Sequence, residues 1–145
     1  ARVTLDTLWP RAVLPSADEK TLYVADGDVE RGDVCQLFAY PLNAHGSVGH
    51  CKTLLTFAAV ERGIEGMCLD SDGNIIACLG WKKSGSGPAI IVVSPGGTIL
   101  ETHPAPADMP MRCAFGDADL ASLYVTAGDG GVYRAKGIGR RGLKR

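Results

Sequence analysis

Two short apolar runs joined by a polar turn form the clearest pattern in the chain. Residues 67–69 (Met-Cys-Leu) and residues 75–79 (Ile-Ile-Ala-Cys-Leu) flank the turn sequence Asp-Ser-Asp-Gly-Asn at residues 70–74. Asp-Gly between apolar runs is a strong hairpin signal, because Gly accepts the positive φ that a tight turn needs. The pattern predicts a pair of antiparallel strands, with the acidic residue Glu65 just before the first of them.

The same unit occurs three times, because residues 11–25 and 111–127 repeat the order of apolar run, polar turn and apolar run. When the units are aligned on the last residue before the turn, Arg11, Glu65 and Met111 become equivalent. Their separations are 65−11=54 and 111−65=46, an average of 50 residues. Short strands at this period, without a helical pattern, are typical of a β-propeller with one repeat per blade.

The other apolar segments extend this pattern to an all-β fold of three antiparallel blades. We expect the blades at about residues 10–58, 64–102 and 110–136. The alternating residues 2–6 predict a lone strand, and the third blade has only three strands of its own, so we expect strand 2–6 to complete a neighbouring blade. Three blades leave two open edges, which proteins avoid. Either the chain is half of a larger propeller or two copies form one ring.

Charge and composition exclude several classes of partner. The net charge of −1 gives no field that would draw the chain to nucleic acid or to an anionic membrane. No apolar run is long enough to span a bilayer and no signal peptide is visible, so we expect a cytoplasmic protein. The basic residues 140–145 are predicted to be a loose, solvated end.

The five cysteines show no zinc-ligand spacing, and we expect five reduced thiols, as is usual in the cytoplasm. A bridge between Cys35 and Cys51 is the alternative. The Asp-Ser-Asp-Gly-Asn segment superficially resembles the start of a calcium loop. The rest of that motif is missing, so the segment is predicted to be a hairpin turn.

Four motifs together resemble the gluconolactonase and senescence-marker-protein (regucalcin-like) family. They are Glu-Lys-Thr-Leu-Tyr-Val-Ala-Asp at residues 19–26, Gly-Ile-Glu-Gly-Met at residues 63–67, Asp-Gly-Asn at residues 72–74, and Cys-Ala-Phe-Gly at residues 113–116 followed by Leu-Tyr-Val-Thr at residues 123–126. The resemblance runs from about residue 2 to residue 143 and covers only the C-terminal half of the family. It implies half of a six-bladed propeller, a divalent metal (calcium or zinc) in the channel, and hydrolysis of sugar lactones and related esters.

The resemblance also implies where the channel residues lie. Glu65 corresponds to the family's Asp ligand and keeps the carboxylate on a longer arm. Arg11 corresponds to an Asn ligand, and Met111 with Arg112 to a Thr-Asn pair, although an arginine cannot ligate a metal. Because Glu65 is the sole carboxylate at the channel position, we expect weak or no tight binding of divalent ions by the isolated chain.

Three interpretations of these residues follow. Glu65 is a metal ligand and the general base for water; or Glu65 pairs with Arg11 or Arg112 across the channel mouth; or the arginines bind a carboxylate or phosphate. The first predicts a lactone or ester hydrolase with metal-assisted attack of water. The alternative function is a non-catalytic binding module with an Arg-lined anion site. The expected partners are a small-molecule lactone or anion, and a second copy of the chain or a complementary N-terminal half propeller.

Overall fold

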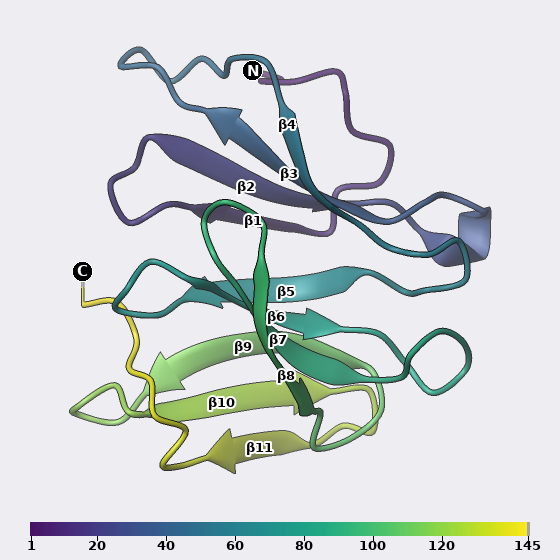
Figure 1. The fold of residues 1–145 in the computed structure, drawn as a ribbon, viewed down its shortest axis with the longest axis vertical. Helices are drawn as coiled ribbons and strands as arrows, with labels where there is room; N and C mark the ends of the chain where they lie inside the picture. The colour runs from purple at the N-terminus through teal and green to yellow at the C-terminus, as the bar shows by residue number, and fades with distance from the viewer. Residues whose placement is uncertain (145) are drawn as a thin grey trace.

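The fold is all-β, with three antiparallel sheets that follow one another along the chain (Figure 1). The computed structural model describes residues 1–144. The first sheet contains β1 (Ala12–Pro15), β2 (Thr21–Asp26), β3 (Gln36–Pro41) and β4 (Lys52–Thr56); the second contains β5 (Ile64–Leu69), β6 (Ile75–Leu79), β7 (Ala89–Val93) and β8 (Ile99–Pro104); the third contains β9 (Pro110–Gly116), β10 (Ser122–Ala127) and β11 (Val132–Ala135). A single 3-10 turn, η1 (Val29–Arg31), links β2 to β3 in the described chain.

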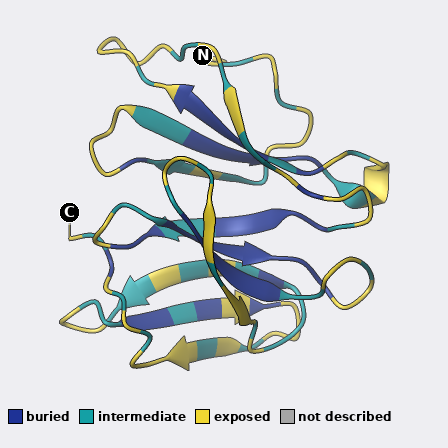
Figure 2. Ribbon diagram, in the orientation of Figure 1, coloured by how far each residue is buried: buried dark blue, intermediate teal, exposed yellow. Residues whose placement is uncertain are grey.

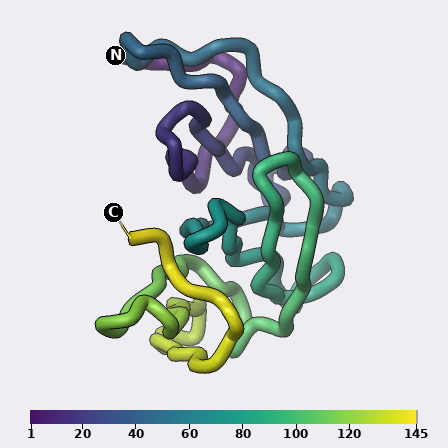
Figure 3. Tube along the Cα trace, turned by 60° about the vertical axis from the view of Figure 1, so that its left-hand side comes forward, coloured from purple at the N-terminus to yellow at the C-terminus, as the bar shows by residue number. Residues whose placement is uncertain are grey.

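Each sheet is one blade, in which neighbouring strands are consecutive in the sequence. The inner strands β1, β5 and β9 bring the blades together, since β5 packs against both β1 and β9. Figure 3 shows the three blades along an open arc. The polar turn between β5 and β6 is a hairpin turn, as expected, with Gly73 at a φ of 81°.

The core lies on the two faces of the middle blade. Every residue of β6 and β7 is buried, which accounts for their unbroken apolar runs (Figure 2). One face packs against the first blade through residues such as Leu37 and Ile91, and the other packs against the third blade through Ile76 and Leu123. By contrast, the outer strands β4, β8 and β11 contain mostly exposed and half-buried residues.

The C-terminal segment is docked through Arg140 and Leu143, so the prediction of a loose end is wrong for its described part, whereas Arg141 and Lys144 are exposed, as expected of a solvated end. Leu143 packs against the main core, and its N–H donates to the Leu69 carbonyl at 3.3 Å. Arg140 forms an ion pair with the buried Asp70 at 2.6 Å and another with Glu101 of β8. The charge of Arg140 is therefore matched by two acids of the middle blade. Residue 145, the last of the predicted basic end, lies outside the described residues.

Residues 2–6 form no strand in the single chain. Val3 is 53% exposed and Leu5 is 77% exposed, so neither side chain is covered. The third blade has three strands, β9 to β11, with β11 at its outer edge. Completion of a neighbouring blade by residues 2–6 stays a prediction.

All five cysteines are free thiols. Cys35 directly precedes β3 and Cys51 directly precedes β4, so the antiparallel pairing of these strands places the two at opposite ends of the pair. No helix long and apolar enough to cross a bilayer occurs in residues 1–144.

Candidate functional site

Glu65 owes its position to an irregularity in the pairing of β5 with β6. Ile64 lies opposite Leu79, and Gly66 lies opposite Cys78, so Glu65 is the extra residue of a β-bulge. A bulge re-aims a side chain and is common beside functional sites. The bulge presents a carboxylate that is only 4% exposed at the inner edge of the middle blade.

The third blade has a bulge at the matching position. Arg112 lies opposite Thr126 and Pro110 lies opposite Ala127, so Met111 is the extra residue between β9 and β10. The alignment of the sequence repeats had made Met111 equivalent to Glu65, and the sheet register places both at bulges. Two blades therefore share one backbone geometry, and they differ in the side chain that it presents.

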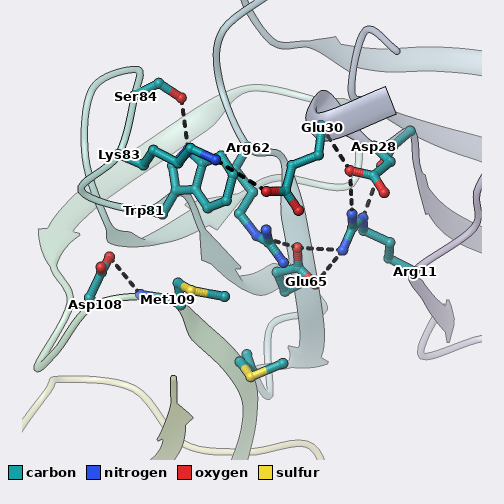
Figure 4. A network of polar contacts seen from close by, with 12 residues as sticks. Arg11, Asp28, Glu30, Arg62, Glu65, Trp81, Lys83, Ser84, Asp108 and Met109 are labelled. Atoms are coloured by element: carbon teal, nitrogen blue, oxygen red, sulfur yellow. Dashed lines mark hydrogen bonds and ion pairs between the residues drawn. The ribbon is translucent and has the colours of Figure 1, made fainter. Parts of the chain in front are cut away.

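Two guanidinium groups approach the Glu65 carboxylate from two sides (Figure 4). Nη1 of Arg11 donates to Oε1 at 2.8 Å and to Oε2 at 3.0 Å. Nε of Arg62 lies 2.7 Å from Oε1, but it does not meet hydrogen-bond geometry, so this contact is an ion pair only. The side chains of Arg11, Arg62 and Glu65 are 15%, 8% and 5% exposed. Charges this well shielded from water interact strongly.

Arg11 is itself fixed by the first blade. Its Nε donates to the Gly27 carbonyl at 3.0 Å, and its Nη2 lies 2.9 Å from Oδ1 of Asp28. Asp28 also caps the 3-10 turn by accepting from the N–H of Glu30 at 3.0 Å. The loop after β2 therefore orients Arg11, and Arg11 bridges a carboxylate of the first blade to one of the second.

The third blade reaches the same centre through Arg112. Its Nη1 donates to the backbone carbonyl of Glu65 and to that of Met111, the latter at 2.9 Å. The neighbouring Gly66 explains how the strands come so close, because a Cβ there would lie 2.9 Å from Cα of Arg112. All three blades thus meet at Glu65.

Trp81 holds Arg62 in place. The Arg62 guanidinium lies 4.7 Å from the centroid of the Trp81 ring, and Nζ of Lys83 lies 4.8 Å from it. Trp81 is only 6% exposed, so its ring is shielded from solvent. Its Nε1 donates to Oγ of Ser84 at 2.8 Å, which satisfies the polar end of the ring.

Positive charge exceeds negative charge at this centre. Three guanidinium groups gather here, since Arg11 and Arg62 pair with the carboxylates of Asp28 and Glu65 while Arg112 binds the Glu65 backbone carbonyl. The nearby Lys83 is paired with Glu30 at 3.2 Å. Within residues 1–144, the two Nη atoms of Arg62 have no hydrogen-bond partner in the protein. The arrangement can therefore donate hydrogen bonds to an added anion.

The residues of this centre do not fit a divalent cation. The described residues contain no group of three or more His, Cys, Asp or Glu side chains that could hold a metal ion. Glu65 is the one carboxylate at the bulge, and guanidinium nitrogens occupy the positions beside its oxygens. A hard cation needs several oxygen ligands, and like charges next to it oppose binding.

The sequence singled out Glu65, Arg11 and Arg112, and the structure brings all three together. The ion pair of Glu65 with Arg11 is present, whereas Arg112 contacts the Glu65 backbone rather than its carboxylate. Sequence reasoning missed Arg62 and Trp81. The closeness of Arg62 to Glu65, three positions apart, was the one available signal for it.

Known proteins that resemble this chain support the propeller architecture and show the family to which the chain belongs. The family model described as the SMP-30/gluconolactonase/LRE-like region matches residues 2–129. The chain belongs to this family. Rabbit (Oryctolagus cuniculus) regucalcin is 26% identical over 143 aligned residues, which cover 88% of this chain and 45% of the relative. A 6-deoxy-6-sulfogluconolactonase of Pseudomonas putida is 34% identical over 92 residues, which cover 63% of this chain and 30% of that protein.

Solved structures show the same fold. A luciferin-regenerating enzyme superposes with a TM-score of 0.76 at 24% identity, covering 95% of this chain and 48% of that one. A calcium-binding protein, regucalcin, from Agrobacterium tumefaciens gives a TM-score of 0.75 at 20% identity, covering 99% and 50%. This family member therefore has the fold of a partial β-propeller, and it spans about half the length of the relatives it matches.

Proposed function

We propose that this protein is a sugar-lactone hydrolase that favours lactones carrying an anionic group, and that this chain supplies the arginines that bind that group. The gluconolactonase-like family supports the reaction class. The excess of guanidinium groups around Glu65 is the observation that carries the substrate class. One relative is named a 6-deoxy-6-sulfogluconolactonase, and that name denotes a sulfonated, hence anionic, lactone.

Each residue of the centre has a distinct part in this proposal. The Nη atoms of Arg62 and the exposed Arg112 bind the anionic group of the lactone, since planar guanidinium forks match carboxylate, phosphate and sulfonate oxygens. Glu65 and the Trp81 ring orient Arg62. Water then adds to the ring carbonyl and the ring C–O bond opens, which yields a hydroxy acid.

Glu65 is a positioning residue in this scheme. The alternative role, a general base, needs an oxygen free to accept a proton from water. Both oxygens of Glu65 already accept hydrogen bonds from Arg11, and Arg62 lies beside one of them. We therefore assign Glu65 to the orientation of the arginines, and no step of the proposal passes through a metal ion.

The direct experiment compares a neutral and an anionic lactone. Acid release from glucono-1,5-lactone and from its 6-phospho derivative is followed in weak buffer against the spontaneous rate. We expect the anionic lactone to have a KM lower by roughly 10- to 100-fold, because a hydrogen bond to a charged group contributes about 1.5–3 kcal/mol. Arg62→Ala should abolish the difference.

Lys83→Ala is the matched control, because Lys83 lies over the same Trp81 ring but does not contact Glu65. This variant should keep the preference for the anionic lactone. Equal KM values for the two lactones in the wild-type protein would contradict the substrate class. A hydrolysis rate no faster than the spontaneous one, with both lactones, would contradict the reaction class.

The second candidate function is a non-catalytic module that binds an anion at the same arginines. It rests on the same guanidinium groups around Glu65, which can bind an anion whether or not a lactone is opened. Binding of the hydroxy-acid product without turnover of either lactone would support it over the hydrolase.

We also propose that a second copy of the chain closes the channel, with a complementary N-terminal half as the rival partner. Exposed apolar side chains support association: Val13 on β1 is 63% exposed, Val132 on β11 is 72% exposed, and Leu5 and Leu8 are 77% and 70% exposed. Such residues at opposite ends of the arc are suited to contact another blade.

A further inference from the structure

Three cysteines from three strands meet where the second and third blades pack together. Cys68 belongs to β5, Cys78 to β6 and Cys113 to β9. The Sγ atoms of Cys68 and Cys113 are 3.6 Å apart, although 45 positions separate the residues in the sequence. All three contribute to the apolar cluster between the blades. The mechanism proposed above uses none of them.

We propose that Cys68 and Cys113 are a thiol-oxidation site that a peroxide converts to a disulfide joining the second blade to the third. The S–S bond of a disulfide is about 2.05 Å long, so the sulfur atoms must approach each other by about 1.5 Å. The two strands already pack directly at this level, because Gly66 of β5 leaves no room for a Cβ beside Cα of Arg112. Small side-chain rotations are therefore the main change that the bond requires.

Access to solvent selects this pair among the three thiols. Cys68 lines a cavity of about 300 Å³ with Phe115 and Leu143. Cys113 is half-buried, whereas Cys78 is fully buried. Hydrogen bonding to Cys68, then to Cys78, and burial raise the pKa of the Cys113 thiol well above its usual value of 9.0. Because Cys68 is the one of the three that lines this cavity, it is the thiol that an oxidant entering the cavity meets first.

The chemistry balances in two steps with hydrogen peroxide as the oxidant. The Cys68 thiolate attacks one peroxide oxygen, the O–O bond breaks, and a sulfenic acid and hydroxide result. The Cys113 sulfur then attacks the Cys68 sulfur, the S–O bond breaks, and the departing hydroxide takes the thiol proton and leaves as water. Two thiols and one peroxide give one disulfide and two waters.

The bond would act on the Glu65 centre as well as on the blade packing. Cys113 directly follows Arg112, which donates to the Glu65 carbonyl, and Cys68 lies three residues after Glu65. A covalent link at this place restrains both inner strands. We expect the oxidised chain to unfold at a temperature higher by roughly 5–10 °C, and a thiol reductant to reverse the rise.

Peptide mapping of the full chain after peroxide treatment tests the site without any substitution. Trypsin leaves Cys68 and Cys78 together in the peptide of residues 63–82, and it places Cys113 in the peptide of residues 113–134. A second cleavage before Asp70 separates Cys68 from Cys78. We expect a linked pair of Cys68 and Cys113 peptides, lighter than the free peptides by two hydrogen atoms, that disappears on reduction.

Single substitutions give an independent test. Cys68→Ala and Cys113→Ala should abolish the linked pair, whereas Cys78→Ala should retain it. Cys51→Ala is the matched control, since Cys51 is half-buried but lies in a different cluster. A linkage through Cys78, or separate over-oxidation of Cys68 and Cys113 with no linked peptide, would overturn the proposal.

Discussion

At the scale of single residues, the centre of the molecule is a buried carboxylate held between two arginines. Glu65 accepts two hydrogen bonds from Arg11 and lies 2.7 Å from Nε of Arg62. Taking such charges out of water is costly, and only their mutual attraction compensates. Loss of one partner leaves the others buried and unbalanced. The stability of this region therefore depends on all three charges together.

The substitution Glu65→Gln tests this dependence. We expect it to lower the free energy of unfolding by about 3 kcal/mol, because it leaves two shielded guanidinium groups without the negative charge that balances them. Urea unfolding monitored by tryptophan fluorescence measures the change. Glu30→Gln is the matched control: the pair of Glu30 with Lys83 is 54% and 69% exposed, and its loss should cost less than about 1 kcal/mol. An equal decrease in the free energy of unfolding in the two variants would show that the buried Glu65 charge stabilises the chain no more than an exposed one does.

The sequence predicted which residues gather at this centre better than it predicted their contacts. Repeat alignment made Glu65 and Arg11 equivalent, and equivalent positions in adjacent blades lie side by side. The sequence did not predict a role for Arg62, because it precedes β5 in a segment without a hydrophobic pattern. It did not predict one for Trp81, because the residues that follow Trp81 are polar. Their roles depend on how two loops fold against each other, and no strand periodicity encodes that arrangement.

At the scale of strands, the close approach of β5 and β9 determines how the second and third blades meet. Gly66 makes it possible, since an added Cβ would lie 2.9 Å from Cα of Arg112. A backbone atom cannot rotate away, so a larger residue must push the strands apart. The strands themselves were predictable from their apolar runs and from the turn residues between them. The bulges at Glu65 and Met111 were not predictable, because one extra residue in a strand does not change the apolar pattern recognisably.

Gly66→Ala should therefore destabilise the chain by roughly 1–3 kcal/mol, the usual cost of overpacking. Gly96→Ala is the control, because the atom nearest to an added Cβ there is 3.9 Å away and the backbone needs no positive φ. Thermal unfolding of the two variants gives the comparison. A Gly66→Ala chain as stable as Gly96→Ala would mean that the strands separate freely.

The ion pair between the C-terminal segment and β8 makes the free energy of unfolding decrease at acid pH. Arg140 and then His103 lower the pKa of the Glu101 carboxyl from 4.5 to about 2. The folded state therefore binds fewer protons than the unfolded state between these values. The contribution of Glu101 to the free energy of unfolding is complete above about pH 4.5 and is lost as the pH falls towards 2.

Melting temperatures measured from pH 7 to pH 2 should show this loss in the wild-type chain. The decline below pH 4.5 should be shallower in Glu101→Gln, and also in Arg140→Gln, since each removes one member of the pair. Profiles of both variants parallel to that of the wild type would contradict the linkage.

At the scale of the whole molecule, the three blades leave apolar faces that another chain can cover. Val13 and Val132 mark the two ends of the arc, and both are more than half exposed. Apolar surface of this kind lowers its free energy by association. The sequence repeat predicted the number of blades. It did not predict which chain packs against the first and the last blade, because contacts between chains produce no periodic pattern in the sequence.

Light scattering on the purified chain should give about twice the monomer mass of 15.2 kDa. Such a mass supports closure by a second copy. Aggregation that ends only when a second polypeptide is added supports the complementary half instead. A stable folded monomer would refute assembly altogether.

Guanidinium groups neutralise the Glu65 carboxylate and occupy the positions that a divalent cation would need. Elemental analysis of the purified chain after exhaustive dialysis tests it most directly. With Arg11 and Arg62 beside its oxygens, we predict that no calcium or zinc is retained in stoichiometric amount. One tightly held calcium or zinc ion per chain would contradict the account, since it would require the arginines to leave the carboxylate.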